Sequence, residues 1–182
     1  MKPLKKMAMA ALCALALQGC AANDRVGLTF LFLNMGQYGI GVTRFDVDGR
    51  QLGGPGALGS DRHLLTPEIG GGKQMSYMPE KGRGPSVPEE IVVEWSVATP
   101  EVVEARRYRN ARFKLYSPQW MEETARINET APHYLQRIDL KALLTPELIN
   151  QVKSDRRGTQ LKLLVKFNHD KVDVTARAEK WR

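Results

Sequence analysis

The sequence predicts a β-rich α+β fold, with a mostly antiparallel sheet of about six strands and two or three helices. Two observations favour this class. Short segments with alternating apolar residues recur along the chain and are separated by stretches rich in glycine and proline. In addition, a hydroxyl residue stands directly before a proline at the start of each helical segment, as it does at many helix N-termini.

Strand patterning recurs along the chain. The segments that show it are residues 26–34, 38–47, 73–78, 90–97, 112–116, 160–167 and 171–178. The first is apolar on both faces, which is typical of a central strand. In the fourth, every second residue from Ile91 to Val97 is apolar, which indicates one buried face. Asp48-Gly49 predicts a turn after the second segment, and residues 168–170 predict the turn of a terminal hairpin.

Helices are predicted at Thr99-Pro100, Ser117-Pro118 and Thr145-Pro146. Proline fits the first turn of a helix, because its missing N–H would have no partner there. The helix at Thr99 is expected to be shorter than the others, and the last helix is expected to run to Arg157 and end at Gly158. Residues 53–72 and 79–88, which contain many glycines and prolines, are predicted to be long loops.

The first twenty residues follow the order of a bacterial lipoprotein signal. Three lysines give a positive start, and residues 7–17 are apolar and uncharged. This stretch is shorter than the roughly 20 residues that a spanning helix needs, and it fits a signal-peptide core. Leu17-Gln18-Gly19-Cys20 then resembles the lipobox, in which the signal is cut between Gly19 and Cys20 and the cysteine receives lipid.

The signal divides the chain into three parts. Residues 1–19 are expected to be the signal peptide, residues 20–26 a lipidated tether and residues 27–182 a single globular domain. Cys13 leaves with the signal and Cys20 is acylated, for example with palmitate, so the mature chain has no free thiol for a disulfide or a thiolate metal site. The acyl chains are expected to hold the protein on a membrane.

The net charge first suggests a nucleic-acid binder. The chain has 27 Lys and Arg against 20 Asp and Glu, which gives +7. Cleavage after Gly19 removes three lysines and no acid, which leaves 24 basic and 20 acidic residues, or +4. Ala21 and Ala22 stand where an aspartate often retains lipoproteins in the inner membrane. We therefore expect the protein on the periplasmic side of the outer membrane, without a nucleic-acid partner.

The sequence lacks the motifs that would indicate catalysis, a cofactor or a metal ion. His63, His133 and His169 do not have metal-ligand spacing. Residues 60–63 contain Ser, Asp and His, but neighbours on a short loop rarely form a catalytic triad. Residues 70–73 resemble a phosphate loop without its upstream glycine and its Ser or Thr. We expect a protein that is not an enzyme and that holds no cofactor or metal.

Two groups of residues are candidates for contact with a partner. The first mixes cations with aromatic residues between Arg106 and Tyr116, and its predicted contacts are Arg106, Arg107 and Arg109. The second lies between the two predicted long loops and at the second of them, and consists of Lys73, Met75, Tyr77, Met78 and Arg83. The first group fits an acidic protein surface or anionic lipid, and the alternative is a solvated strand and helix end with an apolar back face.

Three features follow the lipobox in order. They are a strand and turn at residues 38–49, a glycine run at residues 70–72 and the segment Glu90-Ile91-Val92-Val93-Glu94-Trp95. This order, over roughly residues 34–95, resembles a class of small lipoproteins of a domain of unknown function, encoded near type VI secretion effectors. Members of that class are regarded as periplasmic immunity proteins, notably against phospholipases. Relatives often have a cysteine pair after the glycine run, whereas this chain has Gln74-Met75-Ser76-Tyr77.

The resemblance implies a periplasmic lipoprotein that binds and neutralises a cognate secreted toxin, a type VI effector and most naturally a phospholipase. The membrane would be contacted through the lipid anchor. The two predicted long loops are expected to supply the surface that covers the toxin. The alternative is a structural lipoprotein subunit of an envelope or secretion complex.

Overall fold

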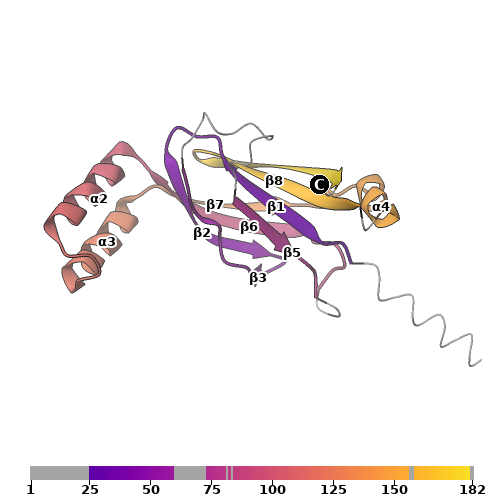
Figure 1. The fold of residues 1–182 in the computed structure, drawn as a ribbon, viewed down its shortest axis with the longest axis horizontal. Coiled ribbons are helices and arrows are strands. Elements are labelled where there is room, and N and C mark those ends of the chain that lie inside the picture. Colours follow the sequence, from indigo (N-terminus) through magenta and orange to yellow (C-terminus); the bar gives the residue numbers. More distant parts are fainter. Residues whose placement is uncertain (1–24, 60–72, 81, 83, 156–157, 181–182) are drawn as a thin grey trace, which may run out of the picture.

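Two β-sheets face each other, and a pair of helices projects from one end of them (Figure 1). The structure, a computed structural model, describes residues 25–59, 73–80, 82, 84–155 and 158–180, which form nine strands and three helices. The predicted β-rich α+β class is confirmed, and the strands are divided over two mostly antiparallel sheets. The predicted signal peptide and Cys20 lie outside the described residues.

The first sheet has the strand order β5-β1-β8-β9. Its strands are β1 (Leu28–Asn34), β5 (Lys73–Tyr77), β8 (Thr159–Asn168) and β9 (Lys171–Lys180). β1 is parallel to β8, and the other two pairs are antiparallel. The predicted central strand, short strand and terminal hairpin are all present in this sheet.

The second sheet has the order β3-β2-β6-β7, with β4 paired to β2. Its strands are β2 (Gly39–Val47), β3 (Arg50–Gln51), β4 (Gly56–Leu58), β6 (Glu90–Ala98) and β7 (His133–Asp139). Asp48 and Gly49 have φ of 49° and 76°, the positive values that a tight hairpin turn requires. The alternate residues of β6 from Ile91 to Val97 are at most 1% exposed, which confirms its predicted buried face.

Aromatic rings form part of the contact between the two sheets. Phe30 and Phe32 of β1 meet Phe45 of β2 edge-to-face, with ring centroids 4.9 and 5.0 Å apart. Trp95 of β6 is 1% exposed, and its Nε1 donates a hydrogen bond to the backbone oxygen of His169 at 2.8 Å. This bond ties the second sheet to the β8–β9 turn.

The helix α4 (Pro146–Ser154) closes one end of the sandwich. The Thr145 hydroxyl accepts a hydrogen bond from the N–H of Leu148, as predicted from the hydroxyl–proline pair. Val152 is buried in the same core as the two sheets. α4 ends before the predicted Arg157, because Asp155 leaves the helical conformation and its side chain accepts the N–H of Gly158 at 3.0 Å.

Residues 112–116 are not a strand, and this prediction is wrong. The chain forms the helices α2 (Pro100–Arg112) and α3 (Pro118–Thr130), and residues 113–117 connect them. The predicted caps are confirmed, since the side chains of Thr99 and Ser117 accept the N–H groups of Val102 and Trp120. α2 is as long as α3, at 13 residues, and not shorter as predicted.

Candidate protein-interaction site

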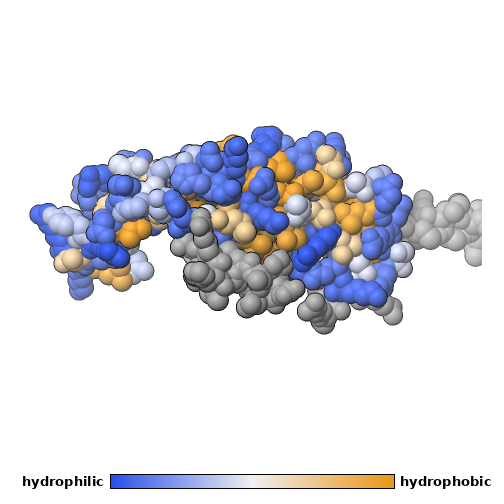
Figure 2. All heavy atoms as spheres, turned by 90° about the horizontal axis from the view of Figure 1, so that it is seen from above, coloured by the Kyte–Doolittle hydropathy of each residue, from blue (hydrophilic) through white to orange (hydrophobic). Residues whose placement is uncertain are grey.

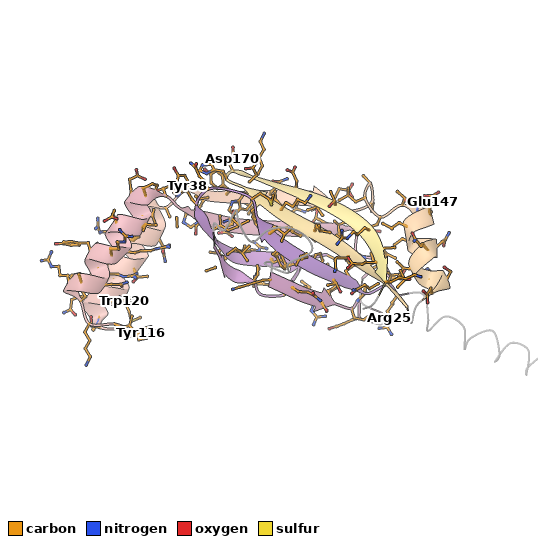
Figure 3. All side chains as sticks on the ribbon, turned by 45° about the horizontal axis from the view of Figure 1, so that its top comes forward. Arg25, Tyr38, Tyr116, Trp120, Glu147 and Asp170 are labelled. Carbon is orange, nitrogen blue, oxygen red and sulfur yellow. The ribbon has the colours of Figure 1, made fainter. Side chains whose placement is uncertain are left out.

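The helical hairpin α2–α3 is an insertion between β6 and β7 that projects away from the sheets (Figure 1). At its base it has a small apolar core of its own, formed by Val102, Ile127 and Ala131. Its far end carries Tyr116 and Trp120, and the first described residue, Arg25, lies at the opposite end of the molecule (Figure 3). The hairpin is therefore the part of the protein that reaches furthest from the start of the described chain.

Arg109 fastens the two helices of the hairpin to each other. Its side chain donates to Thr124 Oγ1 at 2.8 Å and to Asn110 Oδ1 at 2.9 and 3.1 Å, and its guanidinium lies 4.1 Å from the ring centroid of Trp120. Only 8% of Arg109 is exposed. We therefore correct its predicted role, since this side chain faces the other helix and is not free to contact a partner.

The tip of the hairpin exposes large apolar and aromatic side chains. Tyr108, Leu115, Tyr116 and Met121 are 58%, 58%, 74% and 60% exposed. Tyr116 has a φ of 62°, a left-handed conformation that costs most residues free energy and that glycine adopts without strain. Its ring packs edge-to-face against Trp120, with the ring centroids 5.4 Å apart.

Cations surround these exposed side chains. Residues 106–121 contain Arg106, Arg107, Arg109, Arg112 and Lys114, and two acidic residues, Glu122 and Glu123, follow directly on α3. Arg107 pairs with Glu104 at 2.6 Å, whereas Arg112 lies 5.6 Å from the ring centroids of Tyr108 and Phe113. Burial and the neighbouring charge of Arg109 lower the pKa of Arg106. The tip thus joins a positive charge excess to exposed aromatic rings, as predicted for this cluster.

The second predicted contact group lies on β5, in the body of the sandwich, and not on the hairpin. Met75 and Tyr77 pack against the core, so they are not the exposed residues that we predicted. Lys73 is exposed and donates from Nζ to the backbone oxygen of Pro55 at 2.8 Å, and Met78 is 60% exposed. Arg83 lies outside the described residues. The two groups therefore form separate surfaces.

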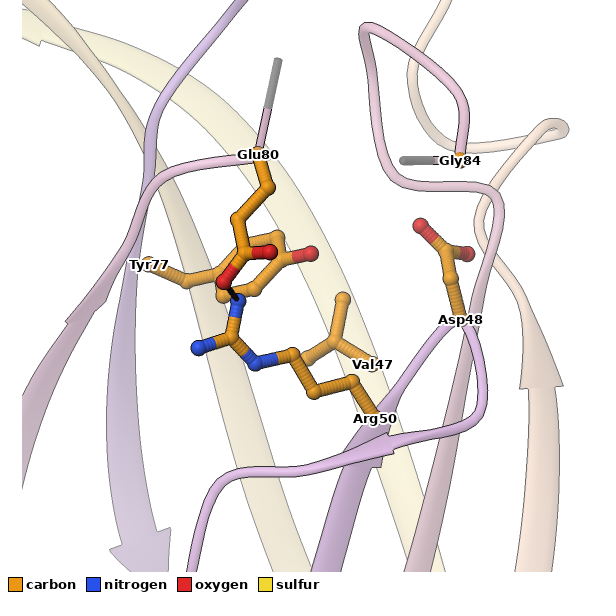
Figure 4. A pocket seen from close by; sticks show the side chains of 6 residues that line it. All are labelled: Val47, Asp48, Arg50, Tyr77, Glu80 and Gly84. Atoms are coloured by element: carbon orange, nitrogen blue, oxygen red, sulfur yellow. Dashed lines mark hydrogen bonds and ion pairs between the residues drawn. The ribbon is translucent and has the colours of Figure 1, made fainter. Parts of the chain in front are cut away.

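A pocket of about 360 Å³ lies beside the end of β5, lined by Val47, Asp48, Arg50, Tyr77, Glu80 and Gly84 (Figure 4). Its charged groups have partners within the chain. Arg50 forms an ion pair with Glu80, and Asp48 accepts hydrogen bonds from the N–H groups of Glu89 and Glu90. Burial, with the nearby Asp48 charge, raises the pKa of Tyr77 and keeps its hydroxyl protonated.

The remaining candidates are distributed over separate parts of the chain. His133 begins β7 and contacts the backbone oxygen of Asn128, while His169 lies in the β8–β9 turn. Residues 60–63 and 70–72 lie outside the described part. Where the chain is described, no three His, Cys, Asp or Glu side chains gather in the manner of a metal site. Within those same residues, no helix combines the length and apolar character needed to cross a bilayer.

Trp120 and Met121 are members of the site that sequence reasoning missed. Both residues lie on α3, outside the predicted basic cluster. They come close to that cluster only because α3 packs against α2. The available signal was the pair Ser117-Pro118, which predicted a helix immediately after the cluster. A helix at that place would put Trp120 within its first turn, close to the tip.

Comparisons of the chain with known protein families, with curated proteins and with solved structures find no match. The fold and the site together define an α+β sandwich with a projecting helical hairpin whose tip is basic and aromatic.

Proposed function

We propose that this protein is a lipid-anchored protein of the bacterial periplasm that binds a cognate secreted toxin and neutralises it through the tip of the hairpin. The observation that supports binding is the exposed group Leu115, Tyr116 and Met121 among cations of α2. The lipobox at Cys20 supports the anchor, on the periplasmic side of the outer membrane. An anchor near Arg25 would leave the tip free to reach away from the membrane.

The chemistry of the tip favours a protein partner with an acidic surface. Tyr, Trp, Met and Arg are enriched in the centres of protein interfaces, and the tip has all of them. Tyr116 and Trp120 touch edge-to-face at 5.4 Å, so part of this surface is already ordered before binding. The excess of cations would speed association with an acidic partner and would make it sensitive to salt.

The resemblance to immunity lipoproteins makes a type VI effector phospholipase the first toxin to test. No catalytic step is required of an inhibitor that covers the active site of its target. The second candidate is a structural subunit of an envelope or secretion complex, which the same projecting tip would attach to a neighbouring protein. Loss of a structural subunit would impair assembly, whereas loss of an immunity protein would remove self-protection.

The direct test is deletion of the gene together with a binding measurement. We expect deleted cells to be killed by sister cells that secrete the effector, and we expect the purified chain to bind a lipase effector encoded beside its gene. Calorimetry gives the affinity, and an enzyme assay gives the inhibition. Normal survival of the deleted cells together with no binding would contradict the proposal.

The role of the tip is tested with the variant Tyr116→Gly. Glycine suits the left-handed backbone at this position, so the variant should be about as stable as the wild type, while its affinity for the effector should fall by at least about tenfold. Thermal unfolding and calorimetry measure the two effects. A variant that binds with unchanged affinity would rule out Tyr116 as a contact.

Leucine offers a matched pair of controls on two surfaces. Leu115 at the tip and Leu135 on β7 are 58% and 60% exposed. We expect Leu115→Ala to weaken effector binding and Leu135→Ala to leave it unchanged. Equal losses in the two variants would show that the contact is not specific to the hairpin.

A further inference from the structure

β9 is an edge strand of the first sheet, with β8 on one side of it. Val172, Val174, Ala176 and Ala178 face the core, and Asp173, Thr175, Arg177 and Glu179 alternate with them on the outer face. The N–H and C=O of Val172 point away from β8, since they bind a side chain of β7. By the same alternation, the backbone groups of Val174 and Ala176 also point outward from the sheet edge.

At this edge, one side chain forms the backbone hydrogen bonds that a neighbouring strand would form. Gln136 of β7 accepts a hydrogen bond from the N–H of Val172 at 2.8 Å and donates to its C=O at 2.9 Å. Its amide thus satisfies both backbone groups, as an opposite residue in a ladder would. In the part of the chain that is described, the outward groups of Val174 and Ala176 have no such partner.

The charges on the outer face of β9 would pair with opposite charges on a second β9 that runs in the antiparallel direction. Along the strand, Lys171, Asp173, Thr175, Arg177 and Glu179 read positive, negative, neutral, positive and negative. When a second β9 lies antiparallel with Thr175 opposite Thr175, Asp173 faces Arg177 and Lys171 faces Glu179. This register also brings the outward backbone groups of Val174 and Ala176 opposite each other, so each can donate one hydrogen bond and accept one.

Neighbouring registers are disfavoured by charge. A shift of the facing strand by two residues in one direction places Asp173 opposite Glu179, and in the other direction it places Lys171 opposite Arg177. Like charges directly opposite each other destabilise a strand pair. Parallel pairing in register would place every charge opposite its own kind. The sequence of β9 therefore selects one antiparallel register.

Within the protomer, two of these four charges pair with each other, and the other two have no ion pair among the described residues. Arg177 and Lys162 both pair with Glu179, at 2.8 and 3.0 Å. No ion pair of Lys171 or Asp173 is found among the described residues, and both side chains are exposed. Figure 2 looks onto the side of the molecule where β8 and β9 lie in Figure 1, and it shows apolar side chains gathered there between polar ones.

We infer that β9 pairs with β9 of a second copy of this chain, in an antiparallel two-fold dimer centred on Thr175. The ladder runs over Val174–Ala176 and ends at Val172, whose edge Gln136 occupies. It is flanked on both sides by Asp173–Arg177 pairs between the copies. The first sheet then continues from one protomer into the other.

A cysteine at the two-fold axis gives the direct test, on the full chain in detergent. Opposite residues in such a pair are close enough for a disulfide, so Thr175→Cys should cross-link two copies under mild oxidation. Asp173→Cys is the matched control, because it faces Arg177 and not itself. Wild-type protein reports any cross-linking through the native cysteines. Cross-linking of Thr175→Cys no stronger than in the control would overturn the inference.

Charge reversal tests the register independently. Asp173→Arg and Arg177→Asp should each weaken the dimer about tenfold, since each replaces two attractive pairs by repulsive ones. The double variant should recover the affinity, because the charges again complement each other. Sedimentation measures the dimer, and circular dichroism checks that each variant folds. A wild type that stays monomeric at high concentration, or a double variant as weak as the singles, would contradict the dimer.

Discussion

Arg107 and Arg109 look alike in the sequence, but they do different things. The Arg107 side chain is 73% exposed and pairs with Glu104 on the same helix. Arg109 is 8% exposed and holds Trp120, Thr124 and Asn110 together. Residues two apart lie on different sides of a helix, so only the one that faces α3 can join the two helices.

Replacement of Arg109 by methionine should therefore destabilise the hairpin. The variant keeps much of the side-chain volume but loses the hydrogen bonds and the contact with the Trp120 ring, and we expect a loss of about 2 kcal/mol. Chemical denaturation followed by Trp fluorescence measures it. Arg107→Met is the matched control and should unfold like the wild type, since exposed ion pairs contribute little. Equal stability of the two variants would contradict the role of Arg109.

At the scale of elements, the hairpin α2–α3 is an insertion in an ordinary antiparallel strand pair. β6 and β7 are in register up to Ser96 and His133, and the N–H of Val97 donates to the backbone oxygen of Pro132 at 3.0 Å. The hairpin has its own small core, separate from that of the sandwich. The two parts should therefore fold with little dependence on each other.

Excision of the hairpin tests this independence. Residues 98–131 are replaced by Asn-Gly, which joins Val97 to Pro132 through a tight turn. We expect a sandwich that still unfolds cooperatively, with Trp95 buried, and that no longer binds the effector. Circular dichroism and thermal unfolding measure the fold. An unfolded product would show that the sandwich needs the hairpin, and retained binding would place the contact elsewhere.

The elements that the sequence did not predict share a physical cause. β7 alternates, but its inward residues Tyr134, Gln136 and Ile138 include a polar amide, and its outward Leu135 is 60% exposed. β4 is three residues long, too short to show a pattern. α2 was predicted as a helix but with too short a length, and its main contacts are with α3 and β6. An element that buries one side shows a periodic pattern of apolar residues. These elements bury little of their surface, so their patterns are weak.

At the scale of the molecule, the two ends have different surroundings. α4 and Arg25 lie at one end, and the basic tip of the hairpin lies at the other (Figure 3). If Cys20 is lipidated, the membrane is at the first end and the partner at the second. Protection of the cell would need both ends of the protein. The anchor would hold the protein at the membrane, and the tip would bind the toxin.

Cysteine variants separate these two requirements. Cys20→Ala should shift the protein from the membrane fraction to the soluble fraction and should reduce protection in cells, while the tip still binds the purified effector. Cys13→Ala, in the apolar core of the signal, is the matched control and should stay in the membrane fraction. Fractionation followed by immunoblotting measures both. A Cys20→Ala protein that remains on the membrane would contradict lipid anchoring through this residue.

The sequence by itself determined the β-rich α+β class, most of the strands, the terminal hairpin and the three helix caps. These features depend on local patterns, namely alternation, turn residues and hydroxyl–proline pairs. Only the tertiary structure decided that the strands form two sheets, that Met75 and Tyr77 face the core and that Arg109 lies between two helices. The physical reason is that these features depend on contacts between residues far apart in the chain, which no local pattern records.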